Sequence, residues 1–308
     1  MTNYFIMMVG LSYSGKSTLA KEIAIKYNGV IHSSDAIRKE LYGDANIQTN
    51  PQKIFQKLGN RVVADLKDGK NVIYDATNLN FKRRVHFLKS IEKIPCKKIC
   101  VVAVTSLKEI FKRKAISTRE VKVPEKIIYR QLQQFTVPYY YEGWDDIRII
   151  QNKNNLLPTQ NLDSLLDVSR MVNHNNPHHS LPIGLHMDAA ATLAKEHYEK
   201  DILIEALQYH DIGKLFTETK DDKGVSHYYN HQFVSAYTYL VYKTTVPYHH
   251  DMYKTILERD LYIAVLIQFH MELRLKKSQA SKEKFKALIG NNIYKDLSVI
   301  STYDVLAH

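Results

Sequence analysis

The first 150 residues alternate between short apolar runs and amphipathic stretches. Apolar runs of strand length, bounded by glycine or polar residues, predict buried β-strands, and apolar residues at helical spacing predict helices between them. The expected strands are 4–9, 30–32, 72–74, 99–104 and 147–150, and the expected helices are 18–27, 50–67, 81–91, 107–114 and 124–135. This alternation predicts a parallel α/β sheet flanked by helices, with right-handed crossovers.

The pattern changes after residue 150. Residues 151–155 are polar, Pro158 follows, and strand-like runs almost disappear. We therefore expect an α/β domain at 1–152, a linker at 153–161 and an all-α domain at 162–308. The helices expected in the second domain are 162–172, 185–194, 202–209, 232–242, 253–269 and 294–307.

The composition, with 44% hydrophobic and 24% charged residues over 308 positions, is that of a soluble globular protein. No apolar stretch is long enough to span a membrane, and the N-terminus lacks the pattern of a signal peptide. The two cysteines, Cys96 and Cys100, lie too close in sequence to suggest a structural disulfide. These features predict a cytoplasmic protein without a membrane partner.

The net charge of +11 favours a polyanionic partner, because clustered cations displace counterions from phosphate backbones. A solvated basic surface that binds nothing large is the alternative. Many of the cations lie in the first half, which favours nucleic acid: Lys82, Arg83, Arg84, Lys97, Lys98, Lys112, Arg113, Lys114, Arg119, Lys122 and Lys126. Tyr139–Tyr141 and Trp144 could stack bases, although a packing role at the domain junction is favoured.

A glycine-rich loop follows the first expected strand and fits the pattern G-x-x-x-x-G-K-S. Its backbone N–H groups, together with the dipole of the next helix, would cradle the phosphates of ATP or GTP. Lys16 would reach the β- and γ-phosphates, and Ser17 would hold Mg²⁺. The cofactor-binding residues expected from this segment are Gly10, Ser12, Ser14, Gly15, Lys16, Ser17 and Thr18.

Two carboxylates follow neighbouring strands, where they would face the phosphate crevice. Asp35 could accept a proton from an attacking hydroxyl, or it could only cap the helix that follows. Arg38 would lie one turn along and could clamp a substrate phosphate. Asp75 is at the position that supports Mg²⁺ in such kinases, whereas Asn78 and Asn80 could be turn residues.

Arg113 precedes, and Arg119 lies within, residues 114–123, a segment that resembles a lid before Pro124. An arginine on a lid over the γ-phosphate would stabilise transition-state charge. A solvated helix face is the alternative for either arginine.

Four features together resemble the polynucleotide 5′-kinases of bacteriophage and bacterial RNA repair. They are the loop Gly10–Ser17, the Asp35/Arg38 spacing, the Asp75–Arg84 run and the Arg119 lid before Pro124. The resemblance covers residues 1–150. It implies that Asp35 is the general base, that Arg38 clamps the 3′ phosphate of the acceptor, and that Arg119 is the lid arginine, with Arg113 as an alternative. Small-molecule P-loop kinases share the first and third features, so the acceptor stays open.

The second half carries His210-Asp211 at the end of an amphipathic segment. Such a pair offers one nitrogen and one oxygen to a metal of intermediate hardness. His186 and Asp304 lie on other expected helices. His231 and His270 could bind a second metal, donate a proton or orient substrate, or they could be polar surface residues. His249-His250-Asp251 is a competing pair that we expect to be a cap. Lys214 could contact a substrate phosphate or face solvent.

The pattern His186…His210-Asp211…Asp304 resembles the HD phosphohydrolase superfamily, as does Asn176-Pro177-His178-His179 before it. The resemblance implies a divalent ion, either Mg²⁺ or a transition metal such as Mn²⁺, Fe²⁺, Co²⁺, Ni²⁺ or Zn²⁺. That ion would generate a nucleophile from bound water near neutral pH.

We therefore expect a bifunctional enzyme that heals nucleic-acid ends, above all those of RNA such as tRNA. It would phosphorylate 5′-hydroxyls and remove 3′-phosphates or 2′,3′-cyclic phosphates, so that an RNA ligase could join the ends. One alternative is a nucleoside or nucleotide kinase fused to a nucleotidase. The other is a nucleic-acid-binding regulator that nucleotide merely switches.

Overall fold

The computed structural model describes residues 3–47, 49–151, 161–176, 180–243, 246–247, 254–255 and 257–307. The chain forms two compact units. Unit 1 comprises Met1–Gln131, Pro138–Lys153 and Pro247–Thr255, and unit 2 comprises Leu132–Val137, Asn154–Val246 and Ile256–His308. The described residues omit 152–160, so most of the expected linker 153–161 lies outside them.

Unit 1 is built on five parallel strands. Their order across the sheet is β2 (Gly29–Ser33), β3 (Asn71–Asp75), β1 (Asn3–Val9), β4 (Cys96–Val104) and β5 (Asp146–Gln151). The short strand β9 (Lys254–Thr255) pairs antiparallel with β5, and β8 (Val246–Pro247) follows it in the sheet. The predicted α/β class is confirmed.

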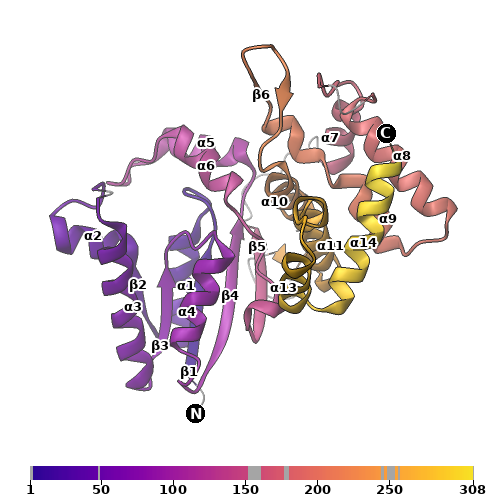
Figure 1. The fold of residues 1–308 in the computed structure, drawn as a ribbon. Coiled ribbons are helices and arrows are strands. Elements are labelled where there is room, and N and C mark those ends of the chain that lie inside the picture. The colour runs from indigo at the N-terminus through magenta and orange to yellow at the C-terminus, as the bar shows by residue number, and fades with distance from the viewer. Residues whose placement is uncertain are drawn as a thin grey trace. The chain divides into compact units, whose positions relative to one another are not determined.

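Helices cover both faces of this sheet (Figure 1). Strand residues alternate between the faces, as the pleat requires. Ile6 and Met8 pack in one core with Leu19 of α1 (Lys16–Tyr27). Phe5 points the other way and lies 5.3 Å, centroid to centroid, from Phe87 of α4 (Phe81–Ser90).

Among its described residues, unit 1 has four further helices and one 3₁₀ turn. They are α2 (Ser34–Tyr42), α3 (Pro51–Lys67), α5 (Leu107–Ile116), α6 (Glu125–Gln133) and the 3₁₀ turn η1 (Tyr140–Glu142). Asn50 holds the N-cap position of α3, but its φ is 50° and its side chain makes no capping hydrogen bond. Gly69, with φ 81°, follows α3 as expected.

The strand register brings the carboxyl ends of β1, β2 and β3 to one edge of the sheet. Asp75 is opposite Met8 on one side and Ser33 on the other. The segments that follow these strands therefore start side by side. This edge carries the candidate kinase site.

Unit 2 is helical, as predicted. Its helices are α7 (Leu162–Ser169), α8 (Ile183–Glu196), α9 (Asp201–Tyr209), α10 (His231–Lys243), α11 (Glu258–Phe269), α12 (Glu272–Leu275), α13 (Gln279–Ile289) and α14 (Asn291–Leu306), with the 3₁₀ helix η2 (Ile212–Phe216). A small hairpin of β6 (Thr219–Lys220) and β7 (Ser226–His227) interrupts them. Within the described ranges, no helix has the length and hydropathy needed to cross a membrane.

Several helix boundaries in this half differ from expectation, and the short helix α12 was not expected. The helix predicted from residue 253 begins at Glu258, because Lys254–Thr255 forms β9 instead. Helix α13 was not predicted. Only Phe285 and Ile289 are buried on it, so its apolar stripe is too sparse to be distinguished from a loop.

Candidate functional site

The glycine-rich loop connects β1 to α1 and is shaped by its glycines. A Cβ at Gly10 would lie 2.6 Å from the carbonyl oxygen of Ala103, so no larger residue fits. Gly15 caps α1 with φ 95° and without a side-chain hydrogen bond. The first N–H groups of α1 are therefore available to an anion.

Lys16 and Asp75 are buried side by side at the mouth of this loop. Burial lowers the pKa of Lys16, which donates a 2.9 Å hydrogen bond to the carbonyl of Leu11. Burial raises the pKa of Asp75, while Lys16 and a hydrogen bond from Ser17 oppose that rise. The Ser17 hydroxyl and the Asp75 carboxylate are hard oxygen donors, which is the chemistry that Mg²⁺ prefers.

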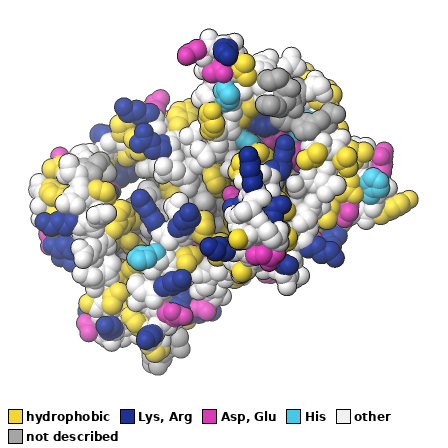
Figure 2. Space-filling view, viewed as in Figure 1, with side chains coloured by type: hydrophobic (Ala, Val, Ile, Leu, Met, Phe, Trp, Pro, Cys, Tyr) yellow, Lys and Arg dark blue, Asp and Glu magenta, His cyan; other side chains and the backbone are white. Residues whose placement is uncertain are grey.

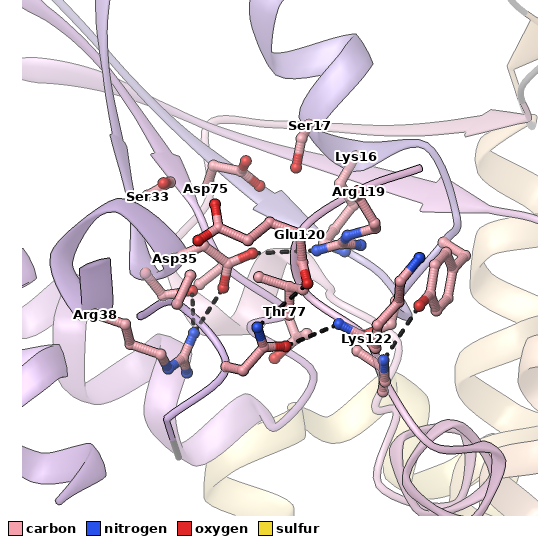
Figure 3. A pocket seen from close by; sticks show the side chains of 18 of the residues that line it. Lys16, Ser17, Ser33, Asp35, Arg38, Asp75, Thr77, Arg119, Glu120 and Lys122 are labelled. Atoms are coloured by element: carbon pink, nitrogen blue, oxygen red, sulfur yellow. Dashed lines mark hydrogen bonds and ion pairs between the residues drawn. The ribbon is translucent and has the colours of Figure 1, made fainter. Parts of the chain in front are cut away.

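Asp35 is held between two arginines (Figure 3). Its Oδ1 accepts from Arg38 at 2.7 Å, and its Oδ2 pairs with Arg119 at 3.2 Å. The alternative that Asp35 caps α2 is wrong, because Ser33 is the cap and accepts from the Ala36 N–H at 3.1 Å. The carboxylate is consequently free to face the pocket.

The segment after α5 closes over the same pocket. The Arg119 guanidinium lies 5.1 Å from the ring centroid of Tyr13. Asn46 accepts from the Lys122 N–H at 2.9 Å and donates to the Glu120 carbonyl at 3.2 Å. Arg113 also lines the pocket but is paired with Glu109 on its own helix at 2.9 Å. Of the two candidate lid arginines, Arg119 is the one in contact with Asp35.

The pocket has a volume of about 1410 Å³ and gathers most of the predicted residues of unit 1. Gly10 and Ser14 do not line it: Gly10 packs against Ala103, and Ser14 is fully buried. The predicted residues that line it are Ser12, Gly15, Lys16, Ser17, Thr18, Asp35, Arg38, Asp75, Arg113 and Arg119.

Lys and Arg side chains gather on the face of unit 1 shown in Figure 2. Arg84, one of the cations expected to favour nucleic acid, is instead buried and paired with Glu142 at 2.6 Å. It also donates to the carbonyls of Asn78 and Leu79. Trp144 is buried too and donates to Glu142, so it packs rather than stacking on bases. Asn78 has φ 47° and Asn80 caps α4, as turn residues do.

The histidines and aspartates of unit 2 converge from five helices. His186 lies on α8, His210-Asp211 ends α9, and Asp304 lies on α14. His231 begins α10 and His270 ends α11. All six are buried, and in three overlapping triads their ligand atoms lie within 4.8 Å of one another. The alternative that His231 and His270 are surface residues is wrong.

Four imidazoles in this cluster are oriented alike. Each Nδ1 lies against a backbone carbonyl: that of Ala307 for His186, Leu207 for His210, Tyr228 for His231 and Ile267 for His270. A carbonyl can only accept, so each Nδ1 carries a proton, and in the neutral imidazole each Nε2 presents a lone pair. These nitrogens face carboxylates and one another: Nε2 of His231 is 3.3 Å from Nε2 of His270.

Lone pairs in such contact repel unless a cation lies between them. Burial would lower the pKa of His210, but Asp211 and Asp304 raise it to about 10. Burial would raise the pKa of Asp211, yet Lys214 and His210 hold it well below its usual range. The cluster therefore attracts positive charge, as protons or as a metal.

Two further residues border this cluster and had no signal in the sequence. His174 accepts from Lys214, Nε2 to Nζ, at 3.0 Å, and Lys214 pairs with Asp211 at 2.6 Å. Burial and Lys214 lower the pKa of His174 to about 4. Arg274 pairs with the outer oxygen of Asp304 at 3.0 Å. Lys214 is buried, so the alternative that it faces solvent is wrong.

Two sequence features fall where the structure gives no description. Residues 177–179 and 248–253 lie outside the described residues. These ranges contain Pro177-His178-His179 and the competing pair His249-His250-Asp251.

Comparison with solved structures gives several matches of low sequence identity. A putative kinase from Chloroflexus aurantiacus J-10-fl is 15% identical with a TM-score of 0.40, over 55% of this chain and 95% of that chain. A chain of the Pnkp1/Rnl/Hen1 RNA repair complex is 24% identical with a TM-score of 0.38, over 43% of this chain and 44% of that one. A gluconokinase from Sinorhizobium meliloti 1021 is 18% identical with a TM-score of 0.37, over 50% and 85%.

No curated protein matches the chain. The family model described as an AAA domain matches residues 5–138. That range holds the glycine-rich loop, Asp35, Asp75 and the lid arginine, on a sheet of order β2-β3-β1-β4-β5. Residues 5–138 thus resemble an AAA domain, and they fold as a parallel sheet with a glycine-rich loop after its central strand β1.

Proposed function

We propose that the chain is a bifunctional enzyme that heals nucleic-acid ends, with RNA as its preferred polymer. Unit 1 would transfer the γ-phosphate of a nucleoside triphosphate to a 5′-hydroxyl. Unit 2 would hydrolyse a 3′-phosphate or a 2′,3′-cyclic phosphate. The observation that carries the first activity is the placement of Asp35 and Arg119 over the phosphate loop.

In unit 1, Asp35 accepts the proton of the attacking hydroxyl as its oxygen bonds to the γ-phosphorus and the bond to the β-phosphate oxygen breaks. Arg119 must leave Asp35 to contact the transferring phosphoryl group, where its charge stabilises the transition state. Lys16 and the N-terminus of α1 bind the β- and γ-phosphates. Mg²⁺, for which Ser17 and Asp75 offer ligands, neutralises phosphate charge when bound.

In unit 2, the inward Nε2 atoms and carboxylates are the support for a metal site. Four imidazoles with two carboxylates suit Mn²⁺, Fe²⁺, Co²⁺, Ni²⁺ or Zn²⁺ better than Mg²⁺, which prefers oxygen ligands alone. A metal held there lowers the pKa of bound water. Lys214 and Arg274 supply positive charge for the substrate phosphate at the border of the cluster.

The polymer assignment rests on charge. The net charge of +11 and the cations over unit 1 favour a phosphate backbone over a small neutral sugar. A 5′-phosphate and a free 3′-hydroxyl are the ends that a ligase joins, so the two activities serve one repair step. A functional partnership with an RNA ligase follows from this proposal.

The test uses a short RNA with a 5′-hydroxyl and a 2′,3′-cyclic phosphate, γ-labelled ATP, Mg²⁺ and Mn²⁺, with both ends resolved on a gel. We expect label at the 5′ end and loss of the 3′ phosphate. Asp35→Asn should remove only the first change and Asp211→Asn only the second.

Three outcomes would contradict the proposal in different ways. Full kinase activity in Asp35→Asn would remove the assigned base, and full hydrolysis in Asp211→Asn would remove the metal site. Phosphorylation of free nucleosides but not of RNA would favour the small-molecule kinase, and binding without turnover would favour the nucleotide-switched regulator.

A further inference from the structure

We propose that Phe55 and Arg83 form a stacking platform for the base of the acceptor nucleotide, so that the kinase pocket selects acceptors that carry a nucleobase. The Arg83 guanidinium carbon lies 6.0 Å from the Phe55 ring centroid, and both side chains line the pocket. The inference rests on the proposed kinase and names what its pocket recognises next to the reacting hydroxyl.

Phe55 is turned away from the core of unit 1. On α3, Ile54 and Leu58 are fully buried, whereas Phe55 between them is half-buried and faces the pocket. The ring lines a pocket that also carries charged side chains, and within the described residues the Arg83 guanidinium lies over it. An aromatic ring at a pocket wall binds most favourably to a flat ligand that can stack on it.

Arg83 differs from its neighbour Arg84 in every contact. Arg84 is buried and bound to Glu142 and two carbonyls. Arg83 is exposed and, among the residues that the structure describes, forms neither an ion pair nor a hydrogen bond. Its planar guanidinium can therefore stack on a base or meet a phosphate without first breaking an ion pair or a hydrogen bond.

The order of the strands places the platform on the acceptor side of the pocket. The phosphate loop follows β1, and Arg113 follows β4, so the nucleotide side is set by those strands. Asp35 follows β2 and Asp75 follows β3 at the same edge. Arg83 is on the helix that follows β3, and Phe55 is on the helix that packs against β2 and β3.

The chemistry of this pair indicates a nucleobase. A base has a π face for the ring and for the guanidinium, and stacking of this kind tolerates any base. A sugar without a base offers neither. We therefore expect the kinase to prefer a 5′-terminal nucleotide with a base over an abasic one, with little preference among the four bases.

The first experiment compares two 5′-hydroxyl oligonucleotides that differ only in having a base or an abasic site at the terminal nucleotide. Phe55→Ala should lower kcat/KM for the base-bearing acceptor about tenfold to a hundredfold and change the abasic acceptor about twofold or less. Arg83→Ala should cost about two- to fivefold for the base-bearing acceptor. Phe55→Trp should keep the preference for the base.

Phe111→Ala is the matched control. Phe111 is also half-buried in unit 1 and packs against Tyr129, but it does not line the pocket. Any loss in this variant should be equal for both acceptors. Equal losses for both acceptors in Phe55→Ala would overturn the platform.

A binding measurement decides the platform even without turnover. With the nucleotide site saturated by Mg²⁺ and a non-hydrolysable ATP analogue, calorimetry compares adenosine 3′-phosphate with ribose 3-phosphate. We expect the base-bearing ligand to bind at least about tenfold more tightly to the native protein and the difference to vanish in Phe55→Ala. Equal affinities would overturn the platform, whereas failure to phosphorylate any 5′-hydroxyl oligonucleotide would overturn only the kinase proposal.

Discussion

The two candidate sites are built with opposite electrical character. The pocket of unit 1 presents N–H groups and cations, with Lys16, Arg38 and Arg119 arranged around the phosphate loop. The cluster of unit 2 presents lone pairs and carboxylates, with Asp211 and Asp304 at its centre. The first arrangement attracts an anion and the second a cation. The sign of the unbalanced charge therefore distinguishes the class of ligand that each site favours.

The two sites also differ in burial, because the ligands proposed for them differ in size. The pocket proposed for the nucleotide has a volume of about 1410 Å³, and the segment after α5 lines it. A metal ion is small, and its six candidate ligands are 7% exposed or less. Four predictions test this contrast, from the largest effect to the smallest.

Deletion of Tyr303–His308 should break the cation site alone. It removes Asp304 and the carbonyl of Ala307 that orients His186. Hydrolysis of the 3′ end should fall at least about 1000-fold, because activation of water by the metal is lost. The 5′-kinase assay on the same preparation is the control. Loss of both activities would mean instead that this last turn supports the whole fold.

Lys16→Met should break the anion site alone. Lys16 is the buried cation at the mouth of the loop, and removal of one such group from a phosphate site costs about 10² to 10³ in rate. Single-turnover kinase kinetics with RNA measure this loss. Metal content and 3′-end hydrolysis should stay unchanged, and a variant with native kinase rates would refute the role of the loop.

Removal of divalent metal should destabilise unit 2 and leave unit 1 unaffected. A ligand present at 100 times its dissociation constant stabilises the folded state by about 2.7 kcal/mol, which chelation would abolish. Thermal unfolding with and without chelator, in native protein and in Asp211→Asn, measures the difference. If the variant responds to chelator as the native protein does, the cluster does not bind metal.

His174→Gln should change the dependence of stability on pH. The pKa of His174 is lowered to about 4, below the value of about 6.5 in an unfolded chain, so the unfolded state binds more protons between these values. Native stability should therefore fall as the pH drops from about 6.5 to about 4. We expect the variant to lose about 1 to 2 kcal/mol less over this range.

Urea unfolding at several pH values in the presence of chelator compares the two proteins. His86→Gln, at an exposed position of α4, is the control. Parallel curves for native protein and His174→Gln would exclude His174 as the group responsible.

The parts of the structure that were predictable are those in which a local pattern fixes a local geometry. The apolar run of β1 followed by Gly10–Ser17 predicts a strand, a tight loop and a helix, and the structure contains all three. His210-Asp211 at the end of an amphipathic stretch predicts a helix terminus. Residues that act through tertiary contacts had no such signal, as His174 and Arg274 show.

Neighbouring residues with the same side chain can also have opposite environments. Arg83 and Arg84 are adjacent in a basic run, yet one faces the pocket and the other is buried beside Glu142, 58 residues away. Composition and charge count them equally. Only the packing of α4 against the segment that holds Glu142 distinguishes them.

The pairing of β9 with β5 has a consequence for any attempt to produce unit 1 separately. Thr255 and Lys254 pair with Ile150 and Gln151, so a segment that lies between two stretches of unit 2 in the sequence pairs with the edge of the sheet. A fragment cut after residue 152 would expose the backbone N–H and C=O groups of β5, and bare edges recruit strands from other molecules. Such a fragment should self-associate on expression, and a version with residues 246–256 appended through a flexible linker should remain dispersed.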